Sequence, residues 1–281
     1  MLKFKNIHKS FGSTVAVDGL SLDIGRGEIF GLLGPNGAGK TTMVNIAIGL
    51  LSSDSGTVSI AGVGPPSDPA CRAKIGVAPQ AIAIYEELTA KENLSFFGKL
   101  QGLAGKKLKD RVAWALEFAG LTERGGDQAR KFSGGMKRRL NLAAALIHDP
   151  PILLLDEPTA GVDPQSRNAI LDNITALSAE GRTIVYTTHY MEEAQKLCDR
   201  IGIIDHGRLL ALGTVEDLIG AHGGPDVLIT GSDTGEERFE TDDPLAELNR
   251  LEGEGRLKSF RVDRPDLEQV FLNLTGRKLR D

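Results

Sequence analysis

A glycine-rich segment near the start of the chain has the residue types and spacing of a phosphate-binding loop. It reads Gly34-Pro35-Asn36-Gly37-Ala38-Gly39-Lys40-Thr41, followed by Thr42, and fits the P-loop pattern GxxxxGK[ST]. Glycines let backbone N–H groups turn toward phosphate oxygens, and a helix that starts there adds a partial positive charge. Lys40 can reach the β- and γ-phosphates of a nucleotide, and the Thr41 hydroxyl can coordinate Mg²⁺.

Two adjacent carboxylates end an apolar run later in the chain. Residues 152–155 read Ile-Leu-Leu-Leu, and Asp156 and Glu157 follow them. Asp156 is placed as a Walker B aspartate that binds the Mg²⁺ shell, and Glu157 is placed to polarise an attacking water. Alone, this pattern is more typical of a buried strand with an acidic end. Together with a P-loop, it favours nucleotide hydrolysis.

The elements that must position these residues alternate between strands and helices. An apolar strand at 28–33 leads into the P-loop, and a helix starts at about Lys40. Residues 152–155 and 183–187 also read as buried strands, each followed by a helical pattern. Strands that alternate with helices predict a parallel sheet with helices on its faces.

Two regions depart from this alternation. The run Thr89-Ala90-Lys91-Glu92 is a capping box, and Leu108, Val112, Leu116 and Ala119 form one helical stripe. We expect a helical subdomain at about residues 85–147. After Gly223-Gly224-Pro225 the chain becomes acidic and rich in turns. The predicted domains are therefore 1–222 and a small accessory domain at 223–281.

The segment Phe132-Ser133-Gly134-Gly135-Met136, which precedes a helix-forming stretch, resembles the LSGGQ signature of ABC ATPases. It keeps Ser133, Gly134 and Gly135 and departs from the family pattern at both flanks. Further motifs follow in the family's order: Phe11-Gly12 as the aromatic A-loop, Gln80 as the Q-loop glutamine, Gly161-Val162-Asp163 as the D-loop and His189 as the H-loop histidine. The resemblance covers about residues 2–220.

The resemblance implies an α/β fold of the P-loop NTPase, ABC ATPase type. This fold has a RecA-like core, an antiparallel β subdomain and a helical subdomain, here with a small C-terminal α+β domain. In this family two cassettes dimerise head to tail, and each ATP lies between the P-loop of one and the signature of the other. A second copy of this chain is the simplest partner.

The resemblance also implies a role for each motif residue. Ser133 and Gly135 would contact the γ-phosphate of the ATP held by the partner's Lys40. Glu157 would orient the attacking water and His189 would stabilise the transition state. The remaining roles are Mg²⁺ and water binding for Asp156, Thr41 and Gln80, and adenine stacking for Phe11.

Charge and composition narrow the choice of partners. The chain of 281 residues has a net charge of −5 and a pI of about 5.6, so we expect no nucleic-acid partner. The basic segment 137–139 is interpreted as a solvated helix face. No apolar run approaches the roughly 18 residues that span a bilayer, and the N-terminus lacks an apolar signal core. We expect a cytoplasmic protein, peripheral on the inner face of the cell membrane through a separate integral-membrane permease.

The C-terminal segment 266–276 resembles the tail of ATPase subunits of ABC-2 type exporters, the group with daunorubicin-resistance-like and sodium-efflux-like members. In the family, the helical subdomain docks on the permease, here by 85–89 and Phe96-Phe97. A soluble ABC ATPase without a transport role is a competing hypothesis. So are a P-loop enzyme outside the ABC class and a cassette that binds ATP without turnover. The intact Lys40, Asp156, Glu157 and His189 argue against the last.

Overall fold

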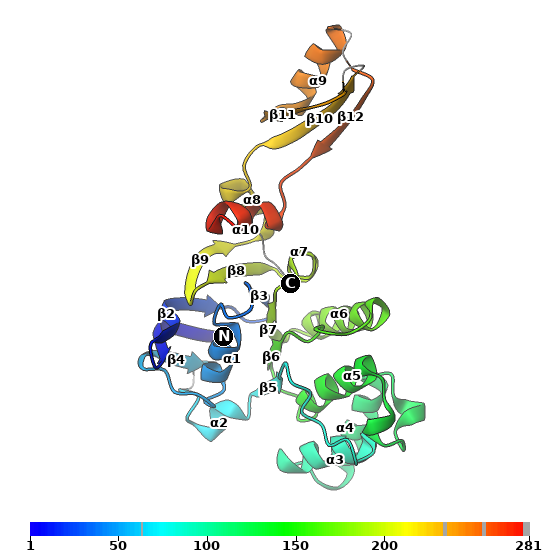
Figure 1. Ribbon diagram of the computed structural model, residues 1–281. Helices are drawn as coiled ribbons and strands as arrows, with labels where there is room; N and C mark the ends of the chain where they lie inside the picture. Colours follow the sequence, from blue (N-terminus) through cyan, green and yellow to red (C-terminus); the bar gives the residue numbers. More distant parts are fainter. Residues whose placement is uncertain (63, 233–234, 255–256, 278–281) are drawn as a thin grey trace. The chain divides into compact units, whose positions relative to one another are not determined.

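The strands of a six-stranded sheet, drawn in Figure 1, lead into the P-loop, the carboxylate pair and His189. In the computed structural model, which describes residues 1–62, 64–232, 235–254 and 257–277, the strand order is β5-β6-β7-β3-β8-β9. The pairs β5–β6, β6–β7, β7–β3 and β3–β8 are parallel, as predicted. The strands span β3 Ile29–Leu33, β5 Ile75–Ala78, β6 Ile152–Asp156, β7 Thr183–Thr188, β8 Arg200–Asp205 and β9 Arg208–Gly213.

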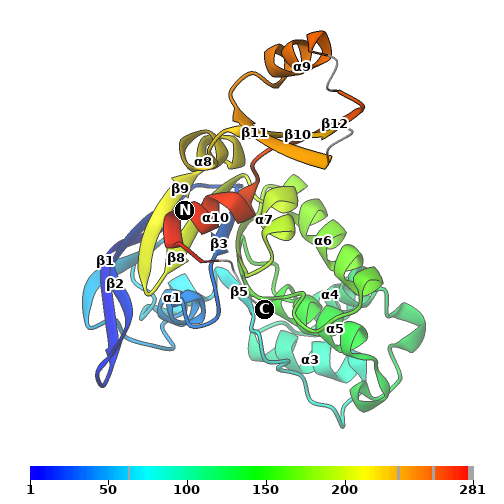
Figure 2. The ribbon, with the colours of Figure 1, turned by 45° about the horizontal axis from the view of Figure 1, so that its top comes forward.

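Both faces of this sheet are covered, which explains why β3, β6 and β7 are buried along their whole length. On one face, α1 (Lys40–Ala47) lies between the sheet and an antiparallel sheet of order β2-β1-β4. The shared core includes Ile24, Phe30, Met43 and Leu154. On the other face lie α6 (Pro164–Ala179) and α7 (Met191–Leu197) (Figures 1 and 2). The antiparallel strands are β1 Leu2–Phe11, β2 Thr14–Ile24 and β4 Ser55–Ile60, and the short α2 (Pro69–Arg72) follows them.

A helical region with its own core separates β5 from β6. It contains α3 (Ala90–Leu100), α4 (Gly105–Phe118), α5 (Gly134–Ala145) and the 3₁₀ turns η1 (Thr122–Arg124) and η2 (Ala129–Lys131). The capping box is confirmed: Glu92 N donates to Thr89 Oγ1 at 3.1 Å, and Thr89 N donates to Glu92 Oε2 at 2.9 Å. The predicted stripe of α4 is buried at Leu108, Val112 and Leu116.

The chain divides into two compact units, Met1–Ala211 and Leu212–Asp281. In the second unit, β10 (Asp226–Ser232) pairs antiparallel with β11 (Gly235–Thr241) and β12 (Ser259–Asp263). Helix α9 (Pro244–Gly253) contacts β10, and α8 (Val215–His222) contacts α10 (Leu267–Thr275). Helix α8 packs within this second unit, although it precedes the predicted boundary at 222/223. That boundary stays a prediction, and a truncation can test it. Within the described part of the chain, no helix is both long and apolar enough to traverse a bilayer.

Candidate active site

The carboxyl ends of three neighbouring strands bring the predicted motifs to one edge of the sheet. Strand β3 leads into the P-loop, β6 ends at Asp156 and Glu157, and β7 ends just before His189. Because β6, β7 and β3 are adjacent and parallel, these ends lie side by side. In α/β sheets, this edge is where ligands bind.

Two glycines of the P-loop are required by close backbone approaches. A Cβ on Gly34 would lie 2.2 Å from Ile204 O, and a Cβ on Gly39 would lie 2.5 Å from Ala16 O. Gly39 also has φ 106°, in the left-handed region that favours glycine, directly before the first residue of α1. These glycines therefore let the loop fold tightly over the end of β3.

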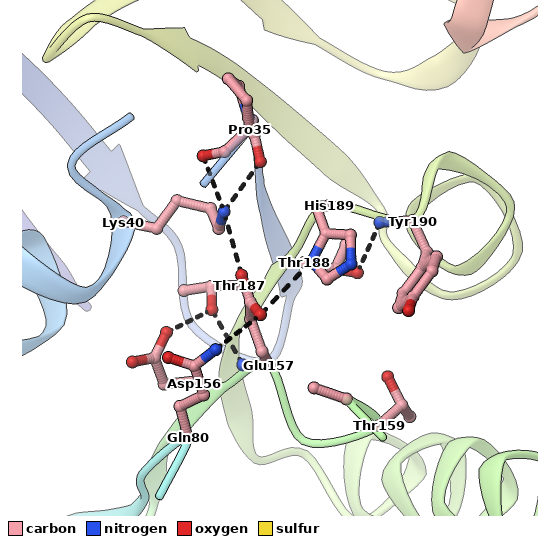
Figure 3. A network of polar contacts seen from close by, with 12 residues as sticks. Pro35, Lys40, Gln80, Asp156, Glu157, Thr159, Thr187, Thr188, His189 and Tyr190 are labelled. Atoms are coloured by element: carbon pink, nitrogen blue, oxygen red, sulfur yellow. Dashed lines mark hydrogen bonds and ion pairs between the residues drawn. The ribbon is translucent and has the colours of Figure 1, made fainter. Parts of the chain in front are cut away.

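Lys40 points back into the loop that carries it (Figure 3). Its Nζ donates to Gly34 O at 2.8 Å and to Pro35 O at 3.1 Å, and lies 3.0 Å from Glu157 Oε1. The side chains of Lys40 and Glu157 are only 4% and 6% exposed, so this ion pair is shielded from water. Removal of either partner would leave a buried charge without its counter-charge.

Glu157 joins four segments of the chain. Its Oε2 accepts a hydrogen bond from Gln80 Nε2 at 3.0 Å and lies 3.3 Å from His189 Nδ1 (Figure 3). Its own N–H donates to Thr187 Oγ1 at 3.0 Å. Glu157 has φ 45°, a conformation that is uncommon for residues other than glycine and that clusters at functional sites. The backbone strain thus occurs at the residue predicted to polarise water.

The three predicted magnesium ligands line one cavity of about 490 Å³: Thr41 from α1, Gln80 after β5 and Asp156 at the end of β6. The Asp156 side chain is buried, and its Oδ1 accepts a hydrogen bond from Thr187 Oγ1 at 2.6 Å. Mg²⁺ takes oxygen ligands and usually keeps several waters beside one or two carboxylates. A hydroxyl, an amide oxygen and a carboxylate around a roomy cavity fit that preference.

A second cavity, of about 410 Å³, lies against the P-loop. Ligand pockets of roughly 300–1,000 Å³ are typical of proteins. The half-exposed ring of Phe11 lines this cavity, with Lys9 Nζ 5.5 Å from the ring centroid. The cavity thus unites the predicted A-loop, P-loop, Q-loop and Walker B residues, and its lining comprises Phe11, Ala16, Asn36, Gly37, Gly39, Lys40, Thr41, Thr42, Gln80 and Glu157.

The signature residues do not belong to the lining of either cavity. Ser133 caps α5 by accepting a hydrogen bond from Met136 N at 3.3 Å, and Ser133 and Gly134 are exposed. Gly135 is buried against the start of α6, where a Cβ would lie 2.1 Å from Ser166 Oγ. Asp163 of the D-loop caps α6, and the hydrogen bond from Ser166 N lowers the pKa of its carboxyl. The exposed N-terminus of α5 therefore packs against the first turn of α6, which the D-loop residue Asp163 caps.

Glu193 is a buried carboxylate that no sequence motif singled out. Its Oε2 accepts hydrogen bonds from Tyr186 Oη at 2.7 Å and from Thr159 and Thr188 Oγ1 at 3.0 Å each. Arg167 Nε lies 3.3 Å from Oε1. Burial, followed by the charge of Glu193, raises the pKa of Tyr186. Thr159 follows Glu157 closely and Thr188 directly precedes His189. The hydrogen bonds to Glu193 therefore hold the loop after Glu157 and the loop that carries His189.

The prediction that the basic segment 137–139 is a solvated helix face was wrong for Arg138. This side chain is 7% exposed, and its guanidinium donates to Gln80 O at 2.6 Å and to Ala160 O at 3.1 Å. Burial lowers the pKa of Arg138, and the negative charge of Glu157 acts in the opposite direction. Sequence composition does not reveal this burial, because the loops that cover Arg138 come from distant parts of the chain.

Comparison with known proteins agrees with this arrangement. A family model described as ABC transporter matches residues 17–160. The chain is 45% identical over 312 residues to a linearmycin resistance ATP-binding protein from Bacillus subtilis, with 100% of both covered. It is 41% identical over 300 residues to Nod factor export ATP-binding protein I from Cupriavidus metallidurans, with 100% of this chain and 99% of that protein covered.

Solved structures give the same result. One titled as the dimeric post-hydrolysis state of an ATP-binding cassette bound to ADP and Pi matches with a TM-score of 0.70 at 29% identity. The match covers 76% of this chain and 98% of that one. Nothing among these relatives favours a soluble ATPase outside transport or a P-loop enzyme outside the ABC class. The chain therefore belongs to the ABC transporter family, as an ATP-binding and ATP-hydrolysing subunit of the exporter type.

Proposed function

We propose that two copies of this chain form two equivalent ATP sites, each built from the P-loop of one copy and the signature of the other. ATP hydrolysis at these sites would drive export through a separate membrane permease. The observation that carries the proposal is the position of Glu157. Its carboxylate meets the P-loop lysine, the Q-loop glutamine and the H-loop histidine, which come from three different loops.

In this proposal Lys40 and Glu157 exchange partners during the reaction. A γ-phosphate that enters the cavity competes with Glu157 for the Lys40 ammonium, since both offer anionic oxygens that accept charged hydrogen bonds from Nζ. The carboxylate released from Lys40 accepts a proton from the attacking water. His189, 3.3 Å from the same carboxylate, donates to the γ-phosphate as negative charge develops there.

Magnesium is the metal that the site favours, and Thr41, Gln80 and Asp156 would hold it. When bound, Mg²⁺ neutralises charge on the β- and γ-phosphates. Thr187 orients the Asp156 carboxylate by a hydrogen bond of 2.6 Å, so the carboxylate points in a fixed direction before metal binds. Gln80 Nε2 donates to Glu157, which leaves the amide oxygen for the metal.

The exposed signature supports a site shared by two copies. Ser133 and Gly134 lie at the N-terminus of α5, a helix of 12 residues whose first N–H groups attract anions. Neither lines the cavity at Lys40 or the cavity of the predicted magnesium ligands, so they are available to the ATP of another chain. Cassettes of this family form dimers, and a homodimer gives two such sites.

An aromatic cluster supports docking of the permease on the helical region. Tyr85 and Phe96 are 50% and 41% exposed, and their ring centroids lie 4.9 Å apart. Phe97 packs edge-on against Phe96 at 5.4 Å. A partly exposed aromatic group of this kind is typical of the centre of an interface. The chain would thus be cytoplasmic and bound to the inner face of the membrane through its permease.

Two substitutions test the catalytic assignment in the full chain. Glu157→Gln keeps the shape but cannot accept a proton, so phosphate release should fall about 10²- to 10⁴-fold while ATP still binds. Lys40→Ala should instead weaken ATP binding itself. Glu123→Gln, at an exposed position, is the matched control and should leave both unchanged. Hydrolysis by Glu157→Gln at the wild-type rate would overturn the role of Glu157, and unchanged ATP affinity of Lys40→Ala would overturn the P-loop assignment.

A further inference from the structure

Arg138 connects the signature helix to two loops of the catalytic site. Its Nη1 donates to Gln80 O at 2.6 Å and approaches Pro79 O at 3.4 Å, and its Nη2 donates to Ala160 O at 3.1 Å. Gln80 follows β5, whereas Ala160 lies between Glu157 and the D-loop. The planar fork of arginine can donate in two directions at once, which lysine cannot do.

Asn141, about one turn further along α5, holds the same Q-loop from a second point. Its Oδ1 accepts a hydrogen bond from Ala83 N at 3.0 Å, and its Nδ2 approaches Pro79 O at 3.4 Å. Residues three apart lie on the same face of a helix, so Arg138 and Asn141 act together. The backbone on both sides of Gln80 is therefore attached to α5.

The first turn of α5 packs against the start of α6, the helix that follows the D-loop. Gly135 packs so closely on the start of α6 that a Cβ there would overlap Ser166, and α5 and α6 are in contact. A shift of α5 must therefore move the Q-loop, the D-loop or both. Gln80 in turn donates to the Glu157 carboxylate at 3.0 Å, so such a shift reaches the group that would activate water.

We propose that Arg138 is a positioning residue that ties the placement of Gln80 and Glu157 to that of the signature helix. The proposal rests on the proposed function, in which the signature of each chain contacts the ATP of the other. In such a dimer Arg138 links the two sites: engagement of Ser133 and Gly134 by the partner's ATP sets the position of Gln80 in the chain's own site.

The chemical environment of Arg138 agrees with a positioning role. Burial of a guanidinium is costly, and its two close acceptors are carbonyl groups of functional loops rather than a carboxylate. An apolar residue at this place would cover the same surface without that cost. The arginine is therefore explained by the two carbonyls that accept its hydrogen bonds.

A double-mutant cycle tests the proposal. Arg138→Met, Gln80→Ala and the double variant are compared in the full chain by kcat and KM for ATP. Arg138→Met should lower kcat about 10-fold or more, because charged hydrogen bonds to the Q-loop are lost, and should leave KM nearly unchanged. If Arg138 acts through Gln80, the substitution should have less than about a 2-fold effect in the Gln80→Ala background. Arg138→Lys should restore only part of kcat.

Arg111 supplies a matched control. It also donates to backbone carbonyls, Leu146 O at 2.7 Å and Ile147 O at 3.1 Å, but these lie just after the end of α5 and not in the Q-loop. Arg111→Met should lower the melting temperature without changing kcat per folded molecule. If Arg138→Met does not fold, Asn141→Ala replaces it in the same cycle with Gln80→Ala.

The proposal would be overturned by an unchanged kcat of Arg138→Met or by losses that multiply in the double variant. A wild-type chain without ATPase activity would instead refute the proposed function, so the two failures are distinguishable. A loss of kcat by Arg111→Met equal to that of Arg138→Met would also refute the specific role of Arg138.

Discussion

Gly135→Ala is the substitution that best separates packing from nucleotide contact at the signature. The added Cβ would lie 2.1 Å from Ser166 Oγ and 2.6 Å from Ser166 Cβ, distances that force α5 and α6 apart. Overpacking of this kind costs about 1–3 kcal/mol, and alanine in a helix returns about 0.5–1 kcal/mol. Mid-range values of these two terms leave a net cost of about 1 kcal/mol, which for a unit of this size should lower the melting temperature by about 2–4 °C.

Gly134→Ala is the matched variant, because no heavy atom lies within 4 Å of a Cβ built there. Its stability should stay within about 1 kcal/mol of wild type, so any loss of ATPase activity reports on the nucleotide rather than on folding. Thermal unfolding by circular dichroism and phosphate release measure the two effects separately.

A second-site substitution completes the test. Ser166→Gly removes both overlapping atoms, and the nearest remaining atom, Asp163 Oδ2, lies 3.4 Å away. The double variant Gly135→Ala/Ser166→Gly should therefore recover stability relative to Gly135→Ala. A Gly135→Ala variant that melts at the wild-type temperature would refute the packing argument.

Two further predictions concern the domain boundary and pH. Deletion of 223–281 should leave the cassette folded and able to bind ATP, although α8 loses its partner α10; loss of cooperative unfolding would refute the boundary. Burial lowers the pKa of His148 from 6.5. The contact of 3.2 Å between its Nε2 and Ile75 O raises the pKa, but by less than burial lowers it. The unfolded chain thus takes up this proton first as pH falls, so stability is present above pH 6.5 and is lost as pH falls through the lower folded pKa. His148→Gln should lose less stability than wild type between about pH 7.5 and about pH 5, and equal losses would contradict the assignment.

Local patterns allowed much of the fold to be predicted from the sequence. The apolar strand before the P-loop, the run before Asp156 and the Thr89–Glu92 capping box each depend on neighbouring residues, and each has the predicted structure. Residues of the predicted P-loop, Gln80 and Glu157 line a common cavity because the parallel strands β3, β5 and β6 present their loops at one edge, and Phe11 of the antiparallel sheet joins them there.

The buried polar contacts could not be predicted in this way. Arg138 and Glu193 look like ordinary surface residues of helices, yet both are buried by segments remote in sequence. Thr187 lies within a buried strand, and only the pairing of β6 with β7 places its hydroxyl beside Asp156. The sequence does not distinguish the two glycines of the signature. In the structure a Cβ on Gly135 would overlap Ser166, whereas a Cβ on Gly134 would have no neighbour within 4 Å. Such differences arise from tertiary packing, which a motif does not encode.

Complementation between two inactive variants tests most directly whether each ATP site is shared by two copies. One variant carries Lys40→Ala with an intact signature, and the other carries Gly134→Asp with an intact P-loop. In an equal mixture, half of the dimers would pair the two variants, and each such dimer would contain one intact site. Phosphate release should therefore rise clearly above that of either variant alone, up to about a quarter of the wild-type rate if the two sites work independently. A mixture as inactive as its components would contradict the shared site.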